Sequence, residues 1–204
     1  MRDTFIKPNQ SFETTDYSLV SVGKLVTGES WELKRREDKT SMYQLEVKKF
    51  LVERMFLPAD GWTVNVHIDS MERANGGKHP EGKKERVRDA EDCLRKLGVS
   101  IGHDHEFGRA DLVARNQEDE TCVVEVEGDS RKQKEQALYS ALGQTLLQMK
   151  EVSKICYGIA FPDNPDWERQ LTKIPSFVTR KLNLSLWLVG KDEVRDFNRE
   201  ETRR

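Results

Sequence analysis

Apolar residues recur every three or four positions in several parts of the chain, which is the spacing of a helix with one buried face. This spacing predicts helices over 41–56, 86–97 and 131–150, and a further helix after a loop within 162–182. Pro58 and Gly61 end the first helix, and Gly98 caps the second. Over residues 62–68 the apolar positions alternate instead, which predicts a half-buried strand.

Shorter apolar runs predict the other strands. Residues 109–114 and 121–127 flank a short polar tip, so we expect them to form an antiparallel hairpin. Residues 155–161 and 184–190 are almost wholly apolar, which is typical of strands buried on both faces. The order of elements therefore predicts an α/β fold with a central mixed sheet of four to five strands flanked by helices.

The chain of 204 residues suits one domain with appendages, since roughly 150 residues per domain is usual. Residues 1–28 lack a period and are predicted to form an arm or edge strand. Residues 29–190 form the α/β domain, and the charged residues 191–204 are expected to be a frayed tail. The three glycines within 72–84 predict a mobile loop.

Charge and composition narrow the classes of protein. The 34 Lys and Arg residues nearly balance the 36 Asp and Glu residues, so any nucleic-acid surface must be local rather than a result of bulk charge. No apolar run approaches the roughly 18 residues that span a bilayer, which argues against a membrane protein. An odd number of separated cysteines, with no apolar segment near the N-terminus, predicts a cytoplasmic protein with reduced thiols: Cys93, Cys122 and Cys156.

Three carboxylates in the predicted hairpin are the strongest candidates for chemistry. Glu125 and Glu127 lie two residues apart and therefore point to the same face of their strand, and Asp111 lies on the strand before. Grouped carboxylates are costly unless a cation neutralises them, so the pattern favours a Mg²⁺ site, with Mn²⁺ as a substitute. An alternative is that the two glutamates face solvent from an edge strand and that Asp111 is an ordinary strand end.

The same residues, in this order of helices and strands, resemble the PD-(D/E)xK nuclease superfamily, the fold of many restriction enzymes and resolvases. Asp111 is similar to the first acid of the family and Glu125-Val126-Glu127 to its second motif. Glu46 is similar to the glutamate of the core helix, and Gln144 to the glutamine that many members carry on the following helix. The resemblance covers residues 41–190 and implies a restriction endonuclease-like core.

The chain departs from the family at one position, because Glu127 stands where the family has a lysine. The resemblance implies that this lysine orients the attacking water and stabilises charge on the phosphate. Glu127 could act instead as a general base or hold a second metal, as in a few restriction enzymes with Glu-x-Glu. Alternatively, Lys132 or Lys134 at the start of the next helix could reach back and supply the charge.

The leading hypothesis is a Mg²⁺-dependent endodeoxyribonuclease. Asp111 and Glu125 would bind the metal, Glu127 would be the base or a third ligand, and Glu46 would be an outer ligand that orients a metal-bound water. The full set of candidate site residues is Glu46, Asp111, Glu125, Glu127, Lys132, Lys134 and Gln144.

DNA is the expected partner. Basic residues near 78–88 and 34–36 could hold its backbone, although interleaved acids make a solvated helix face an alternative. A homodimer is reasonable, since cutting both strands of a duplex generally needs two sites. The competing hypothesis is a nuclease-fold subunit that has lost hydrolysis and serves in DNA binding or assembly. A third is a fold used only for protein interaction.

Overall fold

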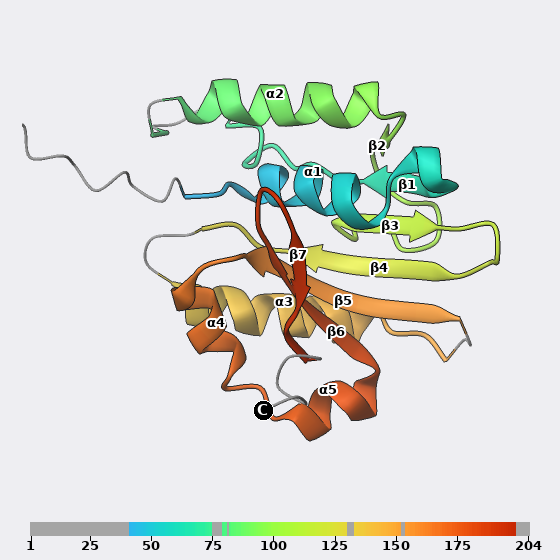
Figure 1. The fold of residues 1–204 in the computed structure, drawn as a ribbon, viewed down its shortest axis with the longest axis vertical. Coiled ribbons are helices and arrows are strands. Elements are labelled where there is room, and N and C mark those ends of the chain that lie inside the picture. The colour runs from blue at the N-terminus through green and yellow to red at the C-terminus, as the bar shows by residue number, and fades with distance from the viewer. Residues whose placement is uncertain (1–40, 75–78, 81, 130–132, 152–153, 199–204) are drawn as a thin grey trace, which may run out of the picture. The chain divides into compact units, whose positions relative to one another are not determined.

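The computed structural model describes residues 41–74, 79–80, 82–129, 133–151 and 154–198. In these residues the chain forms one mixed sheet with strand order β2-β1-β3-β4-β5-β6-β7 (Figure 1). The strands are β1 Thr63–Val66, β2 Ser100–Ile101, β3 Leu112–Arg115, β4 Thr121–Val126, β5 Ile155–Pro162, β6 Leu184–Val189 and β7 Val194–Asp196. The helices are α1 Gln44–Met55, α2 Lys83–Lys96, α3 Lys134–Gln148, α4 Pro165–Leu171 and α5 Ser176–Leu182, and a 3-10 turn covers Pro58–Asp60.

The predicted α/β class with a mixed sheet is confirmed. The hairpin is antiparallel, with Leu112 opposite Val124, and β4, β5 and β6 run parallel to one another. The described part of the sheet has seven strands rather than four to five. The two additional strands, β2 and β7, contain two and three residues, which is too few to produce a recognisable period.

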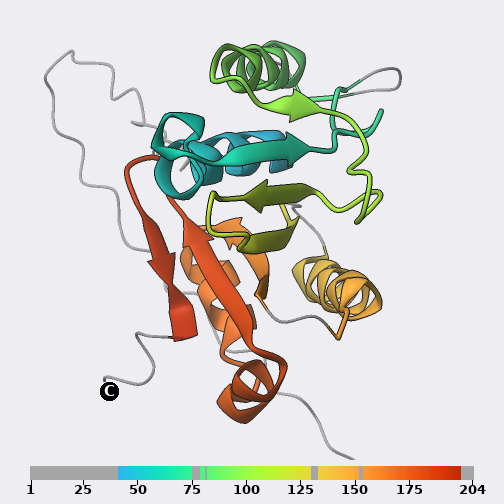
Figure 2. The same cartoon turned by 90° about the vertical axis from the view of Figure 1, so that its right-hand side faces the viewer.

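Helices cover both faces of the sheet, as Figures 1 and 2 show. Helices α1 and α2 pack on one face, where the core includes Leu51, Leu94, Val124 and Val126. Helices α3, α4 and α5 lie on the other side, and the core there includes Leu138, Val123, Trp167 and Leu186. Alternate residues of β4 therefore serve different cores, as a strand covered on both faces requires.

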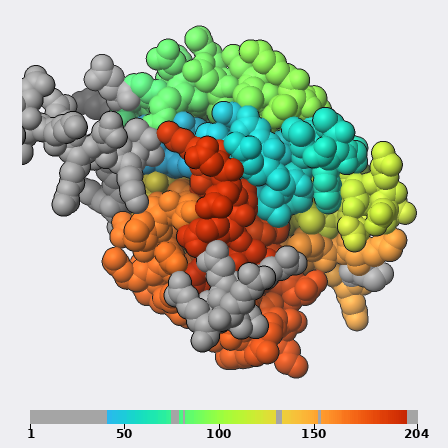
Figure 3. Space-filling view, viewed as in Figure 1, coloured from blue at the N-terminus to red at the C-terminus, as the bar shows by residue number. Residues whose placement is uncertain are grey.

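The expectation of a frayed tail after residue 190 is wrong for the first part of that segment. Strand β7 pairs antiparallel with β6 and runs across the surface seen in Figure 3. Phe197 is buried, and the Arg195 guanidinium donates to both oxygens of Asp163. The predicted arm, residues 1–28, lies outside the described residues. None of the helices in the described ranges has the length and apolar character needed to cross a bilayer.

Candidate functional site

The predicted acids meet at one end of the adjacent strands β1, β3 and β4, in the middle of the sheet. Strand β1 runs antiparallel to β3, and β3 runs antiparallel to β4, so the end of β1, the start of β3 and the end of β4 lie together. Asp111 precedes β3 directly, and Glu125 and Glu127 lie at the end of β4. This topology brings residues from distant parts of the sequence into one group.

The Asp111 carboxylate is fixed by three donors. Its Oδ2 accepts hydrogen bonds from the backbone N–H of Val126 at 2.9 Å and from the Gln44 side-chain amide at 3.2 Å. Its Oδ1 lies 2.7 Å from the ammonium nitrogen of Lys48. The hairpin and helix α1 therefore set the orientation of this carboxylate together.

Lys48 is a central residue of the site that the sequence reasoning did not identify. Its side chain is fully buried, and its Nζ lies 2.7 Å from Asp111 Oδ1, from Glu72 Oε1 and from the backbone carbonyl of His67. Burial alone would lower the pKa of Lys48, but the charges of Asp111 and Glu72 raise it above its ordinary value. The ammonium thus stays charged, with a partner for each of its three protons.

The surroundings of Glu125 and Glu127 disfavour the charged form of both carboxyl groups. Glu125 is 4% exposed, and the Gln148 side-chain amide donates to its Oε1. Burial, and then the charge of Asp111, raise the pKa of Glu125 to about 8 and the pKa of Glu127 to about 7. Val124 and Val126 point into the core on the other face, so the predicted alternation along this strand is confirmed.

Glu72 joins the site from a turn that the sequence predicts only as part of a loop. Asp69 Oδ1 accepts hydrogen bonds from the backbone N–H groups of Met71 and Glu72, which fixes the turn. Glu72 Oε1 contacts Lys48, but Oε2 is buried without a hydrogen-bond partner among the described residues. Burial raises the pKa of Glu72 to about 7.

Glu46 does not meet the other acids, which corrects its expected position as an outer ligand. Its carboxylate accepts from the backbone N–H of Tyr43 at the start of α1 and from the Arg86 guanidinium of α2. Residues two apart on a helix differ by about 200° around its axis. Because Lys48 points toward Asp111, Glu46 points away from it and instead links α1 to α2.

The other basic and amide candidates also have different positions from those expected. Lys134 donates to Asp129, Asn164 and Asp166, near the start of α4, rather than to the acids of the hairpin. Lys132 lies outside the described residues. Gln144 is exposed, and Gln148, one turn later on α3, is the glutamine that contacts Glu125.

One signal in the sequence points to Lys48. It lies on the buried stripe of α1, between Leu45 and Leu51, where a charged residue needs a buried partner. Glu72 follows a polar turn, and the sequence contains no comparable signal for it.

His67 and His103 lie beside the cluster. Their rings are 4.6 Å apart between centroids, and the backbone N–H of His67 donates to the carbonyl of Asp111. Burial, and then His103, lower the pKa of His67. In the loop that follows His103, the Asp104 carboxylate accepts hydrogen bonds from the Arg115 guanidinium.

The donor set fits a hard divalent cation held by few protein ligands. Mg²⁺ in enzymes commonly takes one or two carboxylates, with water and substrate phosphate completing its shell. One ammonium faces four carboxylates here, and an oxygen of Glu72 has no partner in the described residues. Within those residues, however, no three His, Cys, Asp or Glu side chains are grouped as a set of metal ligands. Asp111 and Glu125 are the two acids of the cluster that could hold such a cation, although both oxygens of Asp111 already accept from protein donors.

Comparisons of the chain with protein-family models, with curated proteins and with solved structures gave no match.

Proposed function

We propose that the chain is a Mg²⁺-dependent nuclease that hydrolyses phosphodiester bonds in DNA, on a restriction endonuclease-like core of the PD-(D/E)xK type. The observation that supports it is the group formed by Lys48, Asp111, Glu125 and Glu127 at one end of strands β1, β3 and β4. Three acids from a hairpin with one adjacent lysine are the residue types that metal-assisted phosphodiester hydrolysis uses.

Lys48 supplies the positive charge that the motif lacks at position 127. Its ammonium lies 2.7 Å from Asp111 Oδ1, although it comes from helix α1 rather than from β4 or α3. Lys48 acts as a positioning residue, because it is fully buried and holds both Asp111 and Glu72. The phosphate-stabilising role predicted for Lys132 or Lys134 is not taken over by Lys48, because its ammonium is buried against the two acids.

The acids divide into two roles. Asp111 and Glu125 would hold Mg²⁺, or Mn²⁺ in its place, and the bound ion supplies Lewis-acid activation of a phosphate oxygen and a water. Glu127 is less buried than Glu125, and its pKa of about 7 suits a group that accepts a proton near neutral pH. Glu127 is therefore the candidate general base.

A cavity against helix α2 carries basic side chains that support DNA as the substrate, although none of the acids of the site lines it. Its volume is about 740 Å³, and Arg73, Lys84 and Arg88 are among the residues that line it. Arginine and lysine side chains bind backbone phosphates without reading sequence. Glu85 and Glu91 also line the cavity, so the expected contact is confined to a few phosphates.

A second candidate function has its own observation. The Lys48 ammonium occupies Asp111 Oδ1, one of the two oxygens through which a metal would bind. A permanent ion pair at this place would suit a nuclease-fold subunit that binds DNA or assembles with partners without hydrolysis. In that case DNA binding would not depend on Mg²⁺ or on the charge of Asp111.

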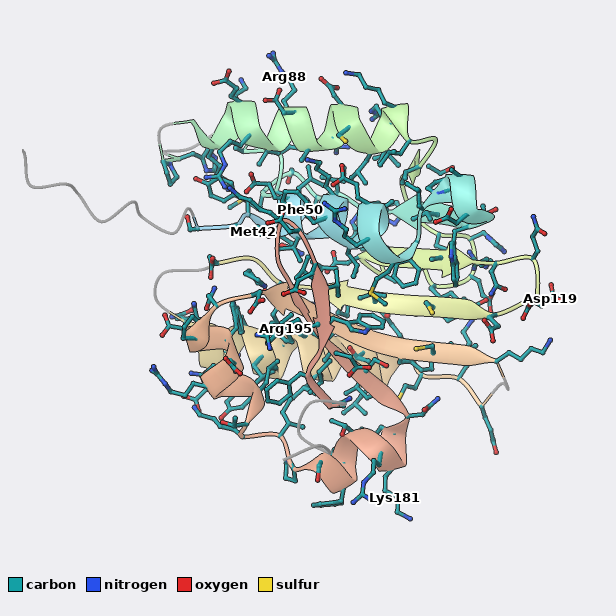
Figure 4. The ribbon with its side chains drawn as sticks, in the orientation of Figure 1. Met42, Phe50, Arg88, Asp119, Lys181 and Arg195 are labelled. Carbon is teal, nitrogen blue, oxygen red and sulfur yellow. The ribbon has the colours of Figure 1, made fainter. Side chains whose placement is uncertain are left out.

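The deciding experiment is cleavage of supercoiled plasmid in Mg²⁺, Mn²⁺ or EDTA. We expect nicking in either metal and none in EDTA. Glu127→Gln should lose at least about a hundredfold, the usual contribution of a general base, and Asp111→Asn should lose cleavage because it removes a ligand of the metal. Asp119→Asn is the matched control, since Asp119 is exposed at the far tip of the hairpin (Figure 4).

The control experiments separate loss of chemistry from loss of fold. Each variant should melt cooperatively, and each should bind the plasmid in Ca²⁺ as the unmodified protein does. Cleavage that persists in Asp111→Asn would refute the site. Binding of plasmid by the unmodified protein without cleavage in any metal, and equally well in EDTA, would favour the second candidate.

A further inference from the structure

Helix α3 is apolar on two opposite faces. One face, with Leu138, Ala141 and Thr145, is buried against the sheet. The other carries Tyr139, Leu146 and Leu147, which are 54%, 49% and 90% exposed. Exposed apolar side chains gathered on one helix face are typical of an interaction surface, and α3 lies at the outside of its layer in Figure 2.

Gly143 lies at the centre of the exposed face. Tyr139 and Leu147 are four residues away on either side, so one turn of helix separates each of them from Gly143. A Cβ atom added at Gly143 would meet nothing within 4 Å. A small residue between larger apolar ones permits the close approach of a second helix, whose side chains fill the space.

We propose that α3 pairs antiparallel with α3 of a second copy of this chain, with the two helices crossing at Gly143. When a twofold axis at Gly143 relates the two helices, a residue before Gly143 in one copy faces a residue about as far after Gly143 in the other copy. The two facing residues lie on the same side of their helices. Tyr139 of one copy then faces Leu146 of the other. Leu147 packs over Ser140 and Gly143 of the second copy.

The charges at the ends of the helix fit this arrangement. Glu135, in the first turn of α3, faces Lys150, just after its last turn, in the second copy. In each protomer Glu135 already pairs with Lys173 and Lys150 with Glu106, at 3.4 Å and 3.1 Å. Such exposed ion pairs contribute little to stability, so the Glu135 and Lys150 side chains can also pair with each other between the two copies.

A second copy suits this face better than an unrelated partner. The face is complementary to itself, because its acidic end meets its basic end only when two such helices run antiparallel. Isologous contacts of this kind are the usual basis of homodimers. The inference is independent of hydrolysis, although α3 also carries Gln148, which contacts Glu125.

The test is the oligomeric state of the full chain, measured by sedimentation equilibrium over a range of concentrations. The unmodified protein should form a dimer. Leu147→Glu should raise the dissociation constant at least about tenfold, which corresponds to about 1.4 kcal/mol. Phe177→Glu is the control, because Phe177 is 60% exposed on α5 and should leave the constant unchanged.

Charge reversal provides a test of orientation. Glu135→Lys and Lys150→Glu should each weaken the dimer, and the double variant should restore it, because the opposed charges are then exchanged. A parallel pair would not show this restoration.

Three results would overturn the proposal. The first is a monomer at all concentrations. The second is a dimer that Leu147→Glu leaves intact. The third is a monomer in which Leu147→Glu lowers the melting temperature, which would mean that another segment of the same chain covers α3.

Discussion

Burial and the neighbouring side chains determine whether the Glu125 carboxyl group is charged. The carboxyl group is buried next to Asp111, and only the Gln148 amide favours its charged form strongly by a hydrogen bond. In the folded protein its pKa is therefore about 8, whereas an unfolded glutamate titrates near 4.3. Between these two pH values the folded state holds a proton that the unfolded state has released.

Stability should consequently fall as the pH rises from about 5 to about 9, because the folded state binds more protons there than the unfolded state. Glu72 and Glu127 contribute with the same sign. Glu125→Gln should reduce the slope most between about pH 5 and about pH 7, where the folded state still holds the Glu125 proton and the unfolded state has released it. Urea denaturation across this range measures the effect.

Glu118→Gln is the matched control for this experiment, since Glu118 is exposed at the hairpin tip. Mg²⁺ should raise stability more at high pH, where the acids are ionised, than at low pH. An equal slope in Glu125→Gln and in the unmodified protein would contradict the burial of this charge.

At the residue scale, spacing identified the acids but not their cation. Asp111, Glu125 and Glu127 are close in sequence within one hairpin, so strand alternation alone groups them. Lys48 reaches them from 63 positions away, given the residue numbers 48 and 111. The buried stripe of α1 indicates that Lys48, and not Glu46, faces the core, but only the packing of α1 on the sheet decides that its partner is Asp111.

At the element scale, the contact between the end of β4 and the start of α1 holds the site together. The backbone N–H of Asp129 donates to the Met42 carbonyl, and Asp129 Oδ2 accepts from the Met42 N–H. A Cβ atom added at Gly128 would lie 2.5 Å from the backbone nitrogen of Gln44. Gly128 thus lets the two elements approach closely enough for Gln44 and Lys48 to reach Asp111.

Gly128→Ala should therefore destabilise the protein by about 1 to 3 kcal/mol, the usual cost of overpacking. Urea denaturation measures the change. Asp89→Ala is the control, because Asp89 is exposed within helix α2 and alanine has the higher helix propensity, so this variant should not lose stability. Equal stability of Gly128→Ala and the unmodified protein would show that β4 and α1 can separate without cost.

Elements with a sustained period were predictable and very short ones were not. The predicted helix over 41–56 corresponds to α1, and the predicted strand over 155–161 corresponds to β5. The two residues of β2 are held only by pairing with β1, and a charged sequence surrounds β7. Such strands form because they pair with the neighbouring strand at the edge of the sheet, not because their own residues favour a strand.

At the scale of the whole molecule, the last strand closes one edge of the sheet. Without β7, the backbone groups of β6 that pair with Val194 and Arg195 would be left at an open edge. Phe197, directly after β7, is 5% exposed and belongs to the core shared by α3 and α4. The segment expected to fray is therefore part of the folded body.

Phe197→Ala should lower the free energy of unfolding by about 3 kcal/mol or more, because the truncation leaves a cavity in that core. Phe177→Ala, at an exposed position on α5, should change it by about 0.5 kcal/mol or less. Chemical denaturation of both variants compares the same substitution in two environments. If the two losses were equal, β7 and Phe197 would contribute nothing to the stable core, and the sheet would end at β6.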